Sequence, residues 1–367
     1  MMEERRKNTM ILYRNLRYQQ LFDDMCSLLK PEEGGARPDA YACASQLIDL
    51  AVTYGFRGNL WHCFLAFCMA NNENAYSTSC EIIGPVGGSL SELARHDFAQ
   101  VRELFSLDIA RLDEAENGIW SEMKHYENAL ENSKAFNHRI RDRIVELSVS
   151  LENAESDQEF QDIVTEFYKE FGVGKFGLNK AFHIIMDDEA KQVDIEPITR
   201  VEHIELNDLV GYELQKAKLI ENTEAFIEGR AANNCLLFGD SGTGKSSSIK
   251  AILNQYYDRG LRMIEVYKHQ FRGLSDVLEQ IKDRNYKFII YMDDLSFEEY
   301  ELEYKYLKAI IEGGLGIKPQ NVLIYATSNR RHLIREKFSD KRELDDDLHS
   351  NDTVQEKLSL VARFGVT

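Results

Sequence analysis

The stretch that most restricts the fold of this chain is a glycine-rich loop at residues 239–246. It reads Gly-Asp-Ser-Gly-Thr-Gly-Lys-Ser and matches the pattern G-x-x-x-x-G-K-[ST] at every fixed position. The apolar run 235–238 precedes the loop, and residues 247–257 read as a helix. This strand, loop and helix order is the context that the pattern requires, so the sequence predicts a phosphate-binding loop. The alternative is a glycine-rich turn that carries a lysine by chance.

Each residue type in this loop has a chemical reason. Glycine at the fixed positions lets backbone N–H groups wrap a polyphosphate, because a Cβ atom there would block the approach. Lys245 is expected to reach the β- and γ-phosphates, and the Ser246 hydroxyl is expected to bind Mg²⁺ at the N-terminal end of the helix. The predicted nucleotide-binding residues of the loop are Gly239, Asp240, Ser241, Gly242, Thr243, Gly244, Lys245, Ser246 and Ser247.

Length and charge limit the classes of protein to consider. A chain of 367 residues favours two or three domains. The chain has 44 Lys and Arg against 62 Asp and Glu, and this net charge of −18 argues against broad coating of nucleic acid. No secretory signal is visible, and the longest apolar run, 60–70, is too short to cross a bilayer. We therefore expect a cytoplasmic protein without a membrane partner.

Helical periodicity dominates the first half of the chain. We expect a mainly α-helical domain over 1–192, which the acidic turn 187–189 and Pro197 separate from a nucleotide-binding domain over 193–367. Residues 172–177 satisfy G-x-G-x-x-G but follow a helical pattern, whereas a dinucleotide fingerprint follows a strand, so we interpret them as a connector. The expected helices span 9–29, 41–54, 59–69, 89 or 91 to about 107, and 156–171, with a long amphipathic pattern over 119–151.

Apolar strands alternate with helices in the second half. The expected strands after the phosphate loop span 262–267, 288–292 and 322–326, and the expected helices span 212–228, 275–284 and 303–313. This alternation predicts an α/β fold, with a parallel sheet that helices cover on both faces and right-handed crossovers.

Two carboxylates follow the strand 288–292. A buried parallel strand that ends in acidic residues delivers them to the edge of the sheet that carries the phosphate loop. We expect Asp293 to hold Mg²⁺, directly or through water, and Asp294 to orient the attacking water. The alternative is a solvated strand end without a chemical role.

The order of these motifs resembles that of the AAA+ ATPases. A phosphate loop, an acidic strand end and a strand that ends in Ala-Thr-Ser-Asn-Arg-Arg at 326–331 follow one another at fitting separations. By this resemblance, Asn329 is the residue that senses the γ-phosphate, and Val210 and Gly211 border the adenine pocket. Over 209–331, about a third of the chain, the sequence is similar to a bacterial AAA+ family of unknown function.

The chain departs from this family pattern in two places. AAA+ hydrolases carry Asp-Glu where this chain has Asp293-Asp294, which shortens the second carboxylate by one methylene group. Residues 357–365 resemble the box that carries an arginine finger, so Arg363 is the candidate finger, with Arg330 and Arg331 as rivals. We expect no room after this box for the fifth core strand or the C-terminal lid, and hence a truncated domain.

The leading functional hypothesis is an ATPase that uses ATP and Mg²⁺ to drive a conformational change in a partner. By the resemblance, Lys245, Asp294, Asn329 and Arg363 are its catalytic residues. The helical domain would select an unidentified protein partner, and ATP would promote homo-oligomerisation. One alternative is a switch or scaffold that binds ATP with little hydrolysis. A P-loop small-molecule kinase is the third, although Asn329 and Arg363 have no evident role in one.

Overall fold

The computed structural model of the chain describes residues 9–31, 37–113, 118–129, 138–187, 192–199, 201–297, 303–312, 319–329 and 364–366. It divides into two compact units, 1–178 and 179–367. The boundary therefore lies before the expected one at about residue 192. The reason is that β1 (Ala181–Asp187) pairs in parallel with β4 (Leu261–Glu265), so the segment after residue 180 belongs to the sheet of the second unit.

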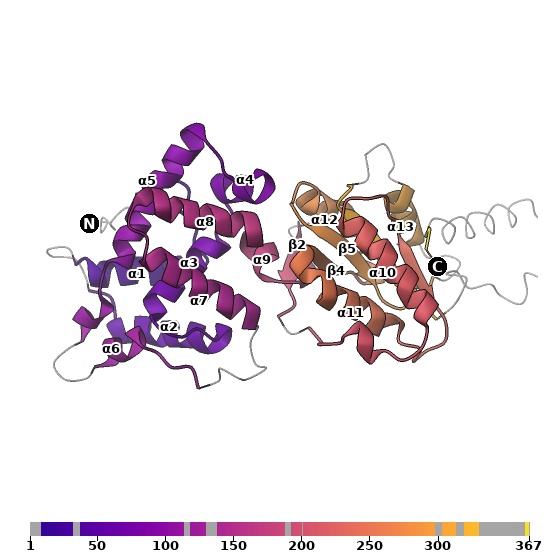
Figure 1. Ribbon diagram of the computed structural model, residues 1–367, viewed down its shortest axis with the longest axis horizontal. Helices are drawn as coiled ribbons and strands as arrows, with labels where there is room; N and C mark the ends of the chain where they lie inside the picture. Colours follow the sequence, from indigo (N-terminus) through magenta and orange to yellow (C-terminus); the bar gives the residue numbers. More distant parts are fainter. Residues whose placement is uncertain are drawn as a thin grey trace, which may run out of the picture. The chain divides into compact units, whose positions relative to one another are not determined.

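The first unit is helical, as the periodicity predicted (Figure 1). Its centre is α3 (Leu60–Asn71), in which every residue from Leu60 to Ala70 is buried. A helix that is apolar on all sides is typical of a core position. Around it lie α1 (Gln19–Leu29), α2 (Ala40–Tyr54), α4 (Ala75–Ile83), α5 (Gly88–Phe105), α6 (Ile119–Lys124), α7 (His138–Glu152), α8 (Asp157–Phe171) and α9 (Gly174–Leu178).

The first predicted helix is shorter than expected. Residues 9–18 are not helical, and α1 begins only at Gln19. In this non-helical segment, the buried carboxylate of Asp97 on α5 accepts hydrogen bonds from the backbone N–H groups of Ile11, Leu12 and Tyr13 at 2.7–3.2 Å. A residue distant in sequence thus satisfies the N–H groups that a local helical ladder does not.

Two further details of the helical unit add to the expectations. The amphipathic pattern over 119–151 includes α6, which ends at Lys124, an antiparallel bridge between Tyr126 and Gly58, and α7 from His138. Helix α5 begins at Gly88 rather than at a serine cap, and the hydroxyl of Ser91 instead accepts a hydrogen bond from the buried Gln161 side chain at 2.8 Å.

The second unit contains a six-stranded sheet in the order β2-β1-β4-β5-β6-β3. Only β1 and β2 are antiparallel to each other, and the other neighbours are parallel. The expected α/β fold class with a helical region before it is confirmed. The remaining elements are β2 (Gln192–Pro197), α10 (Glu213–Ile227), β3 (Cys235–Phe238), α11 (Lys245–Tyr256), α12 (Leu274–Ile281), β5 (Lys287–Met292), α13 (Glu303–Glu312) and β6 (Val322–Ser328).

Helices cover both faces of this sheet (Figure 1). Successive side chains of a strand point to opposite faces, and both sets are buried on β5 and β6. On one face, Ile289 and Leu323 pack with Ile249 and Leu253 of α11. This packing anchors the helix that follows the phosphate loop, and it thereby holds the loop at the carboxyl edge of the strands.

The end of the described chain also reaches the sheet. Val366 forms a parallel bridge with Cys235 of β3, and the Leu236 N–H donates to the Val366 carbonyl at 2.9 Å. None of the helices in the described part of the chain is long and apolar enough to span a membrane.

Replacing Asp97 by Ala should destabilise the helical unit. The change leaves the buried N–H group of Tyr13 and the partly buried ones of Ile11 and Leu12 without their charged acceptor, so we expect the free energy of unfolding to fall by about 2–4 kcal/mol. Urea denaturation followed by far-UV circular dichroism measures this loss. The control is Glu92→Ala on the same helix, where loss of an exposed ion pair with Arg95 should cost less than about 1 kcal/mol. Equal losses in the two variants would contradict the role given to Asp97.

Candidate nucleotide and metal site

The predicted phosphate loop connects β3 to α11 at the carboxyl edge of the sheet. Gly242 and Gly244 have φ angles of +79° and +81°, in the left-handed region that favours glycine. No heavy atom lies within 4 Å of where a Cβ atom would stand at either position. The loop therefore leaves open space beside a backbone that other residues would adopt only with strain, which fits the close approach of a phosphate group.

The side chain of Lys245 folds back over this loop. Its ammonium group donates to the carbonyls of Gly239 and Asp240 at 2.8 and 2.7 Å, and to the Asn329 side-chain oxygen at 3.1 Å. Neutral acceptors thus surround the cation. An anionic phosphate group would compete well with them, because charge-assisted hydrogen bonds are stronger than those to neutral oxygens.

Ser246 and Asp293 lie in direct contact. The Ser246 hydroxyl donates to the Asp293 carboxylate at 2.8 Å, and the Thr327 hydroxyl donates to the same oxygen at 2.5 Å. Burial raises the pKa of the Asp293 carboxyl, but the hydroxyls of Thr327, Ser246 and Tyr291 and the Asp294 N–H outweigh it, so that the pKa lies below its ordinary value. Asp293 is therefore a carboxylate at neutral pH.

Asp294 has an unusual backbone conformation for a residue other than glycine. Its φ is +47°, in the left-handed region, and its N–H donates to the Thr327 hydroxyl at 2.9 Å. Its carboxylate accepts a hydrogen bond from the Asn329 amide at 2.8 Å. Since the Asn329 amide oxygen also contacts Lys245, this one side chain joins the second carboxylate to the cation of the phosphate loop.

The chemistry of these residues fits a hydrated Mg²⁺ ion. Mg²⁺ takes hard oxygen ligands, and proteins usually bind it through one or two carboxylates while it keeps several water molecules. Ser246 and Asp293 supply a hydroxyl and a carboxylate at one point, beside the buried Tyr291 hydroxyl, which has no hydrogen-bond partner. No larger cluster of His, Cys, Asp and Glu that could hold a metal occurs among the described residues.

The structure places the other predicted site residues as follows. Val210 is 94% exposed, and Gly211 has a φ of +86°, so both lie on an open turn before α10, and their contact with adenine stays a prediction. The candidate fingers Arg330, Arg331 and Arg363 lie outside the described residues. The roles of the loop, of Asp293 and Asp294 and of Asn329 also stay predictions, although the structure brings these residues together.

Sequence reasoning missed Thr327 and Tyr291. Tyr291 lies two residues before Asp293, so the two side chains are expected on one face, and Thr327 follows Ala326, the register partner of Met292, and reaches Asp293 through its hydroxyl. The period of two was visible on each strand. The register between β5 and β6, which brings the hydroxyl of Thr327 to Asp293, was not.

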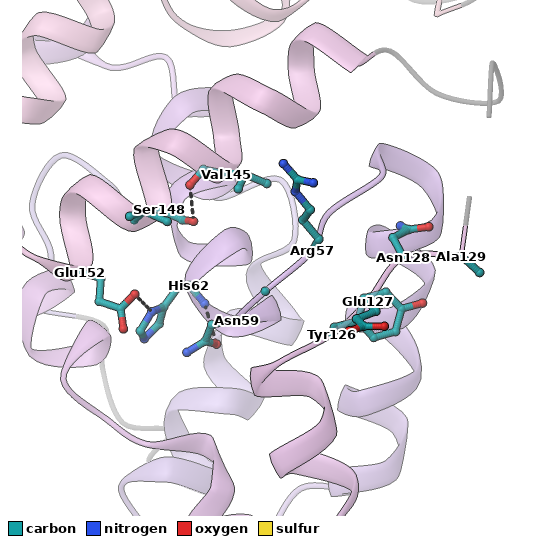
Figure 2. Close-up of a pocket in the computed structure, with 12 residues that line it drawn as sticks. Arg57, Asn59, His62, Tyr126, Glu127, Asn128, Ala129, Val145, Ser148 and Glu152 are labelled. Atoms are coloured by element: carbon teal, nitrogen blue, oxygen red, sulfur yellow. Dashed lines mark hydrogen bonds and ion pairs between the residues drawn. The ribbon is translucent and has the colours of Figure 1, made fainter. Parts of the chain in front are cut away.

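A concave region lies in the helical unit, between α3, α7 and residues 126–129. Its volume is about 730 Å³, and Figure 2 shows His62 facing Glu152 on one side, with Tyr126 and Glu127 on the other. His62 Nδ1 lies 3.5 Å from the Glu152 carboxylate. Burial lowers the pKa of His62 more than Glu152 raises it, so the ring is neutral at pH 7. We assign no ligand to this cavity, because its polar groups do not indicate one chemistry.

Comparison with protein families finds one match, which covers residues 179–367 and thus the whole second unit. The family is described as "Protein of unknown function (DUF815)". The chain belongs to this family. The expected resemblance to a family of unknown function is thereby confirmed, and the DUF815 region includes the phosphate loop, both aspartates and Asn329. A search of curated proteins finds no match.

Solved structures are similar to about half of the chain. RuvB of Thermotoga maritima, described as a Holliday junction branch migration motor, is 17% identical, with a TM-score of 0.29 over 45% of this chain and 47% of that one. DnaI is 21% identical, with a TM-score of 0.30 over 44% and 84%. A putative primosome component of Streptococcus pyogenes is 16% identical, with a TM-score of 0.26 over 50% and 90%. This DUF815 protein therefore spans about half the length of the RuvB chains that it matches.

Thr327→Val tests the contribution of the Thr327 hydroxyl without changing the shape of the side chain. Valine keeps the β-branched form on β6 but leaves the Asp294 N–H without its acceptor, so we expect a loss of about 1–3 kcal/mol in the free energy of unfolding at pH 7. Thr327→Ser keeps the hydroxyl and is the control. Both are measured by urea denaturation.

The pH dependence of this pair gives a second check. The pKa of Asp293 is lowered in the folded state. The hydrogen bond that Asp293 accepts from Thr327 therefore stabilises the fold fully above the ordinary carboxyl pKa of about 4, and this stabilisation is lost as the pH falls and the carboxylate is protonated. The stability difference between Thr327→Val and Thr327→Ser should therefore shrink below about pH 4. A difference that stays constant with pH would argue against a charged partner for the hydroxyl.

Proposed function

We propose that this protein binds ATP with Mg²⁺ and hydrolyses it, and that the released energy drives a conformational change in a protein partner. The observation that carries the proposal is the convergence of Lys245, Ser246, Asp293 and Asn329 at one edge of the sheet. These residues come from a loop and two strands that are distant in sequence. A chance glycine-rich turn has no reason to meet an acidic strand end and an amide there.

Each group has a distinct part in this proposal. The loop backbone and Lys245 bind the phosphates, and Ser246 and Asp293 hold Mg²⁺, which neutralises charge on the β- and γ-phosphate oxygens. Asp294 orients the attacking water molecule. Asn329 already contacts both Lys245 and Asp294, so a γ-phosphate that attracts Lys245 also changes the surroundings of Asp294. This contact supports a sensing role for Asn329.

The second candidate is a switch that binds ATP but hydrolyses it slowly. One specific observation favours it, namely that the short Asp294 carboxylate is bonded to the Asn329 amide. This bond fixes the direction of the carboxylate, and the short side chain limits its reach towards an attacking water molecule. Under this alternative, binding of ATP would be the signal, and hydrolysis would only reset it.

Two substitutions distinguish these functions. Lys245→Ala removes the cation of the loop, and we expect it to abolish ATP binding. Asp294→Asn leaves the loop intact, so binding should persist while phosphate release falls on the order of 10²-fold or more. Equilibrium binding of a fluorescent ATP analogue and a phosphate-release assay measure the two effects.

Lys250→Ala is the matched control, because Lys250 lies on the same helix and contacts the exposed Glu202 instead of the loop. It should bind and hydrolyse ATP like the unaltered chain. If the unaltered chain binds ATP but releases phosphate no faster than Lys245→Ala, the switch is correct. If it does not bind ATP at all, both functions fail.

We further propose that ATP promotes self-assembly and that Arg363 acts on the nucleotide of a neighbouring subunit. Support comes only from the resemblance of residues 357–365 to an arginine-finger box. Size-exclusion chromatography with light scattering should show a larger species in ATP than without it. Arg363→Ala should retain ATP binding and lower turnover by about 10³-fold. A species that stays monomeric in ATP, with full activity, would refute the role in trans.

A further inference from the structure

The hydroxyl group of Tyr291 is buried without a hydrogen-bond partner. Tyr291 lies on β5, two residues before Asp293, and is only 3% exposed. Among the described residues, three buried side chains have a polar atom that makes no hydrogen bond, and Tyr291 is the one beside the candidate nucleotide site. A buried hydroxyl that bonds to nothing costs free energy. Phenylalanine would occupy the same buried position without that cost. The presence of the hydroxyl therefore indicates a hydrogen-bond partner that does not belong to the protein.

The alternation of side chains fixes where this hydroxyl lies. Tyr291 and Asp293 point to the same face of the sheet, which packs against α11, the helix that carries Ser246. The hydroxyl lies within electrostatic reach of both Ser246 and Asp293, and it helps to lower the pKa of the Asp293 carboxyl, yet it makes no well-formed hydrogen bond with either. The unsatisfied oxygen therefore sits beside the two residues expected to hold Mg²⁺.

We propose that Tyr291 is a positioning residue of the metal site, and that its hydroxyl binds a water molecule of the Mg²⁺ hydration shell. Mg²⁺ keeps most of its water when proteins bind it, and groups around those waters orient the ion. A phenol can donate to and accept from such a water molecule. The inference rests on the proposed function and adds to it a residue outside the phosphate loop, the acidic strand end and the sensor.

Tyr325 offers a matched comparison. It lies directly opposite Tyr291 in the register of β5 and β6, and its side chain is fully buried. Its hydroxyl, however, lies 2.8 Å from the Thr223 hydroxyl and 3.0 Å from the Asn222 amide, which donates to it. The two tyrosines thus share strand type and burial but differ in whether the fold itself satisfies the hydroxyl.

The test compares Tyr291→Phe with Tyr325→Phe in the full chain. Isothermal titration with ADP, once in Mg²⁺ and once in EDTA, gives the factor by which the metal strengthens binding. Tyr291→Phe should reduce this factor roughly tenfold and leave the affinity in EDTA unchanged. Tyr325→Phe should leave the factor unchanged.

Thermal unfolding without nucleotide should show the opposite order. Tyr325→Phe loses hydrogen bonds, so its melting temperature should fall by about 2–4 °C, whereas Tyr291→Phe should melt at the same temperature as the unaltered chain or higher. Two results would overturn the inference but not the proposed function. One is that Mg²⁺ strengthens ADP binding by the same factor in Tyr291→Phe as in the unaltered chain, and the other is that the melting temperature of Tyr291→Phe falls as much as that of Tyr325→Phe. Failure of the unaltered chain to bind ADP in either buffer would overturn the proposed function, and the inference with it.

Discussion

The parallel register of β3, β5 and β6 is the constraint on which the candidate site depends. Parallel strands end at one edge, so the phosphate loop after β3, the aspartates after β5 and Asn329 after β6 meet although they lie far apart in sequence. A shift of β6 by one residue would turn Thr327 to the opposite face and remove its bond to Asp293. Burial on both faces resists such a shift, because it would expose or displace every apolar side chain of the strand.

Hydrogen bonds within the site satisfy most of its polar groups without a ligand. Lys245 has three acceptors, and Asp293 and Asp294 each have donors from β6 or the segment after it. Two carboxylates and an ammonium group can therefore lie close together with little cost in unpaired charge. A ligand that enters must replace these contacts, so binding and rearrangement of the site are coupled through Asn329.

The motifs could be predicted from the sequence, because each depends on residues adjacent in the chain. The phosphate loop, the helix after it and the apolar strands are examples. The order of the strands in the sheet could not be predicted from these motifs. Contacts between residues distant in sequence were not visible in this way: Asp97 binds the backbone of residues 11–13, β1 pairs with β4, and Gly58 pairs with Tyr126. Thr327 escaped notice for the same reason, since only the register shows that it adjoins Asp293, whereas the position of Tyr291 two residues before Asp293 was visible in the sequence.

The left-handed backbone at Asp294 bears on why this position holds aspartate where related motifs have glutamate. Among residues other than glycine, short side chains such as those of aspartate and asparagine tolerate this conformation best, because they can bond locally to the chain. Glutamate would extend the reach of the carboxylate but would fit the turn less well. The conformation of the main chain, and not only the distance to a water molecule, therefore selects the residue type here.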